Sequence, residues 1–146
     1  MDHVVADRDT VALATSLERV VSMLRRLAPS EGMSLTAVST LRHAEMVGPV
    51  RTTELAAAQG VTQPAMTQLV TRLERDGYLI RTSSDADARV VLVDITPAGR
   101  ELLAQRRALR AARLSELLRH VPADDRAAIL AATPALNLLA DLGRNL

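Results

Sequence analysis

Residues 52–73 read TTELAAAQGVTQPAMTQLVTRL, and this stretch decides the fold of the chain. Ala56 is small enough for two helices to cross closely, and Gly60, four residues later, allows a tight turn between them. The side chains that we expect to hold the two helices together are Leu55, Val61, Met66 and Leu69. The pattern predicts a helix-turn-helix.

The second helix of this pair, residues 62–75, is predicted to carry a polar outer face. Thr52 is expected to cap the first helix and Thr62 the second, and Pro64 is tolerated in a first turn. Glutamine can pair with adenine, and threonine can meet the methyl group of thymine, so short uncharged side chains suit base edges in the major groove. The side chains that we expect nearest the bases are Gln63, Thr67, Gln68 and Thr71.

After Gly77 the spacing of apolar residues changes from the helical period of 3.6 to the alternation or short apolar runs of β-strands. The runs 79–82 and 90–95 fit β-strands, and the polar stretch 83–88 fits the tip between them. Any helical protein can contain a helical hairpin, whereas a helix-turn-helix followed directly by a two-stranded wing is much rarer. The conjunction favours a winged helix-turn-helix that binds duplex DNA.

Helices are also predicted before and after this segment. Residues 8–28 have amphipathic spacing up to Pro29, and residues 34–47 lie between Ser34 as N-cap and Gly48 as the residue after the helix. A helix from Pro97 to about residue 120 is expected to present a solvated arginine face. Its leucines expected to be buried are Leu102, Leu103, Leu109, Leu114, Leu117 and Leu118.

A last helix is predicted to open at Pro122, and Pro134 should kink or split it. The fold class is therefore mainly α with one β-hairpin wing.

The composition excludes several classes of function. The chain has 146 residues, of which 48% are hydrophobic and 24% charged, as in an ordinary soluble globular protein. Tyr78 is its one aromatic residue, which argues against platforms that stack single-stranded bases on aromatic rings. The absence of cysteine excludes disulfides and thiolate catalysis. Because no catalytic, cofactor or metal-ligand motif is found, we expect neither an enzyme nor a cofactor nor a metal site.

We expect a cytoplasmic protein with no membrane partner. The segment from Met1 to Asp9 holds three acids and no apolar core of signal-peptide length. The longest apolar run, residues 127–140, contains Pro134 and is shorter than the ~20 residues that a membrane span needs.

The charge of the candidate DNA-binding part leaves an alternative open. All 18 basic residues are arginine, the net charge is +1, and residues 51–89 hold five arginines against five acids. This balance supports a dimeric winged-helix adaptor that binds another protein rather than DNA. Arg72, Arg75 and Arg89 favour DNA, because they can lie on the outer side and meet phosphates.

The chain resembles the MarR family of winged-helix transcriptional regulators from about Arg8 onward, most strongly over residues 51–99. The stretches that carry the resemblance are Thr53-Glu54-Leu55-Ala56, Leu69-Val70-Thr71-Arg72-Leu73-Glu74, Asp76-Gly77-Tyr78-Leu79 with Arg81, Asp85-Ala86-Asp87-Ala88-Arg89-Val90-Val91-Leu92-Val93, and Thr96-Pro97-Ala98-Gly99. The chain departs from the family pattern at Ala88, where a second arginine is common, and at Pro134 in the last helix.

The resemblance implies that different segments of the chain have different roles. Residues 1–30 and 97–146 supply the N- and C-terminal helices of a dimerisation lobe, and residues 31–96 form the winged helix-turn-helix. It also implies a homodimer on a pseudo-palindromic operator in double-stranded DNA, often as a repressor. In many members a small aromatic or anionic effector relieves DNA binding.

These considerations define the residues that we expect to contact DNA. Arg89 should reach the minor groove or its flanking phosphates from the wing, with its guanidinium held by Asp87. The full set is Thr52, Thr62, Gln63, Pro64, Thr67, Gln68, Thr71, Arg72, Arg75, Asp87 and Arg89.

Overall fold

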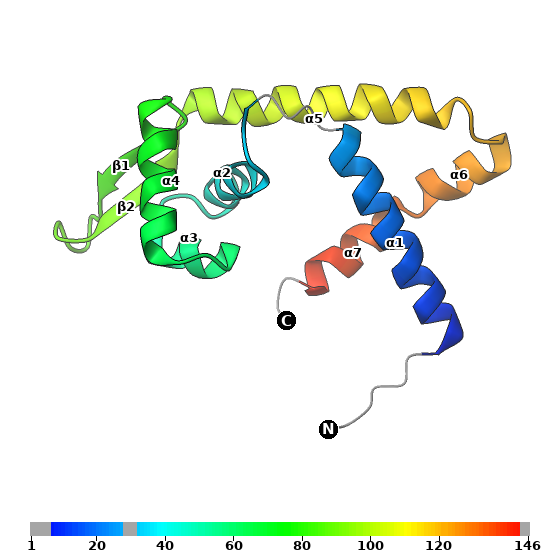
Figure 1. Ribbon diagram of the computed structural model, residues 1–146, viewed down its shortest axis with the longest axis horizontal. Helices are drawn as coiled ribbons and strands as arrows, with labels where there is room; N and C mark the ends of the chain where they lie inside the picture. Colours follow the sequence, from blue (N-terminus) through cyan, green and yellow to red (C-terminus); the bar gives the residue numbers. More distant parts are fainter. Residues whose placement is uncertain (1–6, 28–31, 144–146) are drawn as a thin grey trace. The chain divides into compact units, whose positions relative to one another are not determined.

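The computed structural model describes residues 7–27 and 32–143, and these residues form helices and one hairpin (Figure 1). The helices are α1 (Arg8–Leu27), α2 (Leu35–Val47), α3 (Thr52–Gln59), α4 (Gln63–Arg75), α5 (Pro97–Leu118), α6 (Ala123–Ala131) and α7 (Thr133–Gly143), and the strands are β1 (Leu79–Ser83) and β2 (Val91–Ile95). The predicted mainly helical fold with one hairpin is confirmed. The expected end of the first helix at Ala28 and Pro29 lies outside the described residues.

The chain divides into two compact units, Met1–Leu109 and Arg110–Leu146, whose border lies inside α5. The first unit contains the helix-turn-helix and the hairpin, and the second contains α6 and α7. The lobe boundaries expected at residues 30 and 96 stay a prediction.

Local signals set the ends of α2 as expected. The side chain of Ser34 accepts a hydrogen bond from the backbone N–H of Ala37 at 3.1 Å, which satisfies one of the free donors of the first turn. Gly48 follows the last residue with φ of 83°, a conformation that glycine adopts without a steric penalty.

The turn between α3 and α4 is built on Gly60, whose φ of 62° is left-handed. The helices pack directly on each other, and Leu55 and Ala56 are buried at the crossing. One detail differs from the expectation: the N-cap of α3 is Arg51 and Thr52 is the first helical residue. The Glu54 carboxylate accepts from the Arg51 backbone N–H at 3.0 Å, so the start of α3 is held by an acid reaching back to the N-cap and not by the Thr52 hydroxyl.

The hairpin follows α4 through a tight reversal at Gly77. The N–H of Tyr78 donates to the carbonyl of Leu73 at 2.9 Å, and that of Gly77 donates to the carbonyl of Glu74 at 3.0 Å. This pattern is a Schellman motif, which closes the helix end. β1 and β2 then pair antiparallel, with Leu79 opposite Ile95 and Ser83 opposite Val91.

A third backbone segment joins the sheet at Val50, just before α3. The N–H of Val50 donates to the carbonyl of Val93 at 2.9 Å, and the N–H of Val93 donates back at 2.8 Å. This isolated antiparallel bridge attaches the wing to the start of the helix-turn-helix.

The hydrophobic core of the first unit lies where α2, α3, α4, the hairpin and the start of α5 meet. Aliphatic side chains, Met66 and Thr40 fill it, as the near absence of aromatic residues requires. The largest fully buried side chains are Leu41, Leu55, Met66, Leu73, Leu103, Val70, Val93 and Thr40.

The start of α5 is seated on the hairpin. The Thr96 hydroxyl accepts from the N–H of Gly99 at 3.1 Å and donates to the carbonyl of Gly77 at 2.6 Å. A methyl group added at Gly99 would lie 2.5 Å from the carbonyl oxygen of Tyr78. Only glycine allows α5 to approach this closely.

The leucines of α5 are buried less than expected. Leu103 is buried and Leu102, Leu114 and Leu118 are half-buried, whereas Leu109 and Leu117 are exposed within the single chain. Pro134 splits the last helix into α6 and α7, which confirms the sequence interpretation.

Candidate nucleic-acid interface

α4 separates an apolar face from a polar face along its whole length. The buried residues are Met66, Leu69, Val70 and Leu73. The residues expected nearest to base edges, Gln63, Thr67, Gln68 and Thr71, are all exposed. Arg72 and Arg75 in the last turn are also exposed, and cations near a helix C-terminus are favoured by the helix dipole.

The start of α4 is set by the two residues that the sequence singled out. The Thr62 hydroxyl accepts from the N–H of Ala65 at 3.4 Å, a long capping bond, and Pro64 lies within the first turn. Both residues are exposed, whereas Thr52 at the start of α3 is half-buried.

A network that the sequence analysis missed links α4 to the wing. Arg81 on β1 forms an ion pair through its Nη1 with the Glu74 carboxylate and donates through its Nη2 to the Thr71 hydroxyl at 3.1 Å. The Thr71 hydroxyl itself donates to the carbonyl of Thr67 at 2.9 Å. The family resemblance includes Arg81, but no local pattern signals that it bonds to α4.

The tip of the wing is closed by Asp87, in a way that corrects one expectation. The Asp87 carboxylate accepts from the backbone N–H of Arg89 at 2.9 Å, while the same tip holds a bond from the N–H of Ala86 to the Ser84 hydroxyl. Asp87 was expected to hold the guanidinium of Arg89. It organises the backbone of the turn instead, because an aspartate readily bonds an N–H two residues ahead.

The arginines of this surface differ in how far their charge is compensated. Arg75 Nε lies 3.3 Å from the Asp76 carboxylate, and Arg81 is paired with Glu74. Within the part of the chain that the structure describes, Arg72 and Arg89 have no carboxylate partner. These two guanidinium groups are available to phosphates.

Arg106 and Arg107 are two of the five arginines of α5. Arg107 Nη1 lies 2.9 Å from a Glu45 carboxylate oxygen on α2, and Nη2 lies 3.4 Å from the other oxygen. These hydrogen bonds from Arg107 hold the pKa of Glu45 below its usual range. Arg106 is buried, and its Nε has no hydrogen-bond partner among the described residues. Both features were missed, because the sequence interpretation assigned these arginines to a solvated face.

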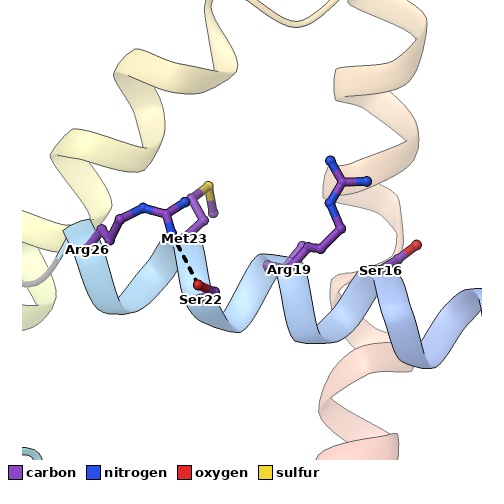
Figure 2. Close-up of a pocket in the computed structure, with 6 residues that line it drawn as sticks. Ser16, Arg19, Ser22, Met23 and Arg26 are labelled. Carbon is purple, nitrogen blue, oxygen red and sulfur yellow. Dashed lines mark hydrogen bonds between the residues drawn. The ribbon is translucent and has the colours of Figure 1, made fainter.

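An open hollow outside the helix-turn-helix runs along one side of α1 (Figure 2). Arg26 donates to the Ser22 hydroxyl at 3.1 Å in this hollow. Its lining comes from one helix, and no acidic side chain contributes to it. The residues that line it are Ser16, Arg19, Val20, Ser22, Met23 and Arg26.

Comparisons with known proteins agree with this geometry. The family model of the MarR family matches residues 31–90. An uncharacterized HTH-type transcriptional regulator of Mycobacterium leprae is 30% identical over 114 residues, which cover 78% of this chain and 80% of that protein. The chain belongs to the MarR family.

Solved structures extend the likeness to more than nine-tenths of the chain. A transcriptional regulator from Thermotoga maritima is 25% identical, with a TM-score of 0.77 over 92% of this chain and 98% of that one. A MarR family protein from Bacillus stearothermophilus, 18% identical, has the same fold, with a TM-score of 0.70 over 93% of this chain and 99% of that one. This MarR-family chain is therefore a DNA-binding transcriptional regulator with a winged helix-turn-helix.

No group of three or more histidine, cysteine or acidic side chains in the part of the chain that the structure describes is placed to hold a metal ion. No helix among the described residues is long and apolar enough to cross a bilayer.

Proposed function

We propose that the chain acts as a homodimeric repressor on a pseudo-palindromic operator, with α4 of each subunit in the major groove. The observation that carries this proposal is the polar face of α4, where four uncharged side chains stand exposed above a fully buried apolar face. Two-fold symmetry would place the paired recognition helices about one DNA turn, ~34 Å, apart.

The contacts divide into two kinds. The side chains that read base edges are Gln63, Thr67, Gln68 and Thr71. The residues that contact the DNA backbone, or that order such contacts, are Thr52, Thr62, Pro64, Arg72, Arg75, Asp87 and Arg89. Arg72 and Arg89 support the second role because no carboxylate among the described residues neutralises them.

Dimerisation is supported by the apolar side chains of the terminal helices. None of the residues of α1, α6 and α7, all of which are described, is buried within the single chain. The exposed large hydrophobic residues of these helices are Val11, Leu13, Val20, Val21, Ile129, Leu130, Leu136, Leu138, Leu139 and Leu142. A soluble monomer rarely exposes so much apolar surface, and a second copy of the chain would cover it.

Release of DNA by a small aromatic or anionic effector belongs to the same proposal. Among the described residues, Arg106 has the burial and the charge to attract an anion, because its Nε lacks a partner.

The test is replacement of Gln68 by alanine. Against a duplex selected by the wild-type protein from a random pool, Gln68→Ala should weaken binding by about 1–3 kcal/mol and leave random DNA nearly unaffected. Gln105→Ala is the matched control, since Gln105 is an exposed helical glutamine bonded to Glu101 on α5. Equal loss on both DNAs would assign Gln68 to the backbone, and absence of any duplex binding at low salt would favour a protein-binding adaptor.

A further inference from the structure

The Thr71 hydroxyl is already committed to protein groups. A threonine hydroxyl has one proton to donate and two lone pairs that accept. Thr71 donates its proton to the carbonyl of Thr67 at 2.9 Å and accepts from Arg81 Nη2 at 3.1 Å. It therefore has no proton left for a base, and the groups that it can still offer without breaking a bond are its methyl and one acceptor lone pair.

We propose that Thr71 reads DNA through its γ-methyl group, and that Arg81 is the positioning residue that holds the side chain in this state. The inference rests on the proposed function, in which α4 lies in the major groove. The chemical partner of a methyl group there is the C5-methyl of thymine. The site thus favours thymine over a pyrimidine that lacks this methyl.

Arg81 is suited to this role by its geometry. Its two terminal nitrogens bond two acceptors one turn apart on α4, the Glu74 carboxylate and the Thr71 hydroxyl, while its backbone belongs to β1. The planar guanidinium can serve both acceptors at once, whereas a lysine ammonium on a flexible stem acts as a point charge. Without these two bonds from Arg81, the Thr71 hydroxyl would be free to leave its hydrogen bond to the carbonyl of Thr67.

Thr67 provides an internal contrast one turn earlier. Its carbonyl accepts from Thr71, but its own hydroxyl makes no hydrogen bond in the described structure. The two exposed threonines of the recognition face should therefore behave differently when the hydroxyl or the methyl is removed.

The experiment begins with a duplex that the wild-type protein enriches from a random pool. Each thymine is then replaced singly by deoxyuridine, and affinities are measured for the wild type, Thr71→Val and Thr71→Ser. At one thymine per half-site the wild type should lose about fourfold, the value of one buried methyl-sized group. Thr71→Val should keep that loss, and Thr71→Ser should bind the two duplexes equally.

Arg81→Lys tests the positioning role, with Thr67→Ser as the matched control. Arg81→Lys should lower the thymine-to-uracil ratio at that position toward one while its binding to random DNA stays within twofold. Thr67→Ser should leave this ratio at about fourfold. If Arg81→Lys retains the full thymine-to-uracil ratio, Arg81 does not position Thr71. Thermal melting of each variant checks that it is folded.

The outcomes separate this inference from the proposed function. If Thr71→Val loses affinity for both duplexes while Thr71→Ser retains the thymine preference, the hydroxyl reads the base and the inference is wrong. If the wild type enriches no duplex at all, the proposed function fails and this inference fails with it.

Discussion

Arg89 stands at the tip of the wing, where no carboxylate of the described residues pairs with its guanidinium and Asp87 holds its backbone. A fixed backbone with a free charge suits a contact with phosphate. Arg89→Ala should weaken DNA binding and lower the slope of log affinity against log salt by about one unit per subunit, because one phosphate contact is lost. Titration with duplex at several salt concentrations measures this slope, and an unchanged slope would show that Arg89 does not meet DNA.

Asp87 offers a complementary test at the same tip. Asp87→Ala removes a negative charge, which by simple electrostatics should strengthen DNA binding. Because the carboxylate holds the N–H of Arg89 at 2.9 Å, we expect weaker binding instead, through a disordered turn. Stronger binding of this variant in the same titration would mean that charge outweighs the order of the turn.

Arg106 is buried, and its Nε has no hydrogen-bond partner among the described residues. An unpartnered buried polar group costs about 1–3 kcal/mol, so Arg106→Leu should raise the free energy of unfolding by about 1 kcal/mol. Chemical denaturation of both proteins measures the difference. A loss of stability would show that the guanidinium has a partner in solution, either an anion or a carboxylate of a second subunit.

At the scale of elements, α5 reaches the hairpin only because residue 99 lacks a side chain. In Gly99→Ala the new methyl would lie 2.5 Å from the Tyr78 carbonyl oxygen and 2.7 Å from Cγ1 of Ile95. We expect a loss of about 1–3 kcal/mol in thermal or chemical unfolding, as in other overpacked sites. Gly143→Ala is the control, because its methyl would enter open space, and it should not destabilise the protein.

The bond between α2 and α5 should show a defined pH dependence. The hydrogen bonds from Arg107 lower the pKa of Glu45 from its ordinary 4.5, so the pair stabilises the fold above that pH and loses its effect as the pH falls through the lowered value. Glu45→Gln should cost at most about 1 kcal/mol at pH 7, since Arg107 is half exposed. The difference between the two unfolding curves should vanish in acid, and a constant difference down to pH 3 would contradict the prediction.

At the scale of the whole molecule, the terminal helices predict the oligomeric state. With no buried residue in α1, α6 or α7, which the structure describes completely, the isolated chain would leave a large apolar surface in water. Sedimentation at micromolar concentration should give twice the chain mass of 15.7 kDa. A single species of chain mass under those conditions would contradict the homodimer.

Sequence-local signals predicted most of the fold. Ser34, Gly60 and Gly77 each act through bonds or dihedral angles within a few residues, and the structure confirms the element boundaries that they indicate. Arg81 bonds residues on another element, and Glu45 meets Arg107 from 62 residues away, so neither interaction leaves a local pattern. Leu109 and Leu117 were expected to be buried because they are apolar. Apolarity does not tell whether the same chain or a second copy covers a side chain, and within the single chain both are exposed.

The reciprocal bonds between Val50 and Val93 bear on how this architecture can be exchanged between relatives. If the wing were joined only to the end of α4, recombination between relatives could replace it as one contiguous segment of sequence. Here the wing also shares two backbone hydrogen bonds with the segment before α3. The smallest segment that can be exchanged with all its partners therefore begins ahead of residue 50. In a chimera that exchanges residues 79–95 alone, the donor strands must keep the register that pairs with Val50 of the recipient, some thirty residues upstream of β1.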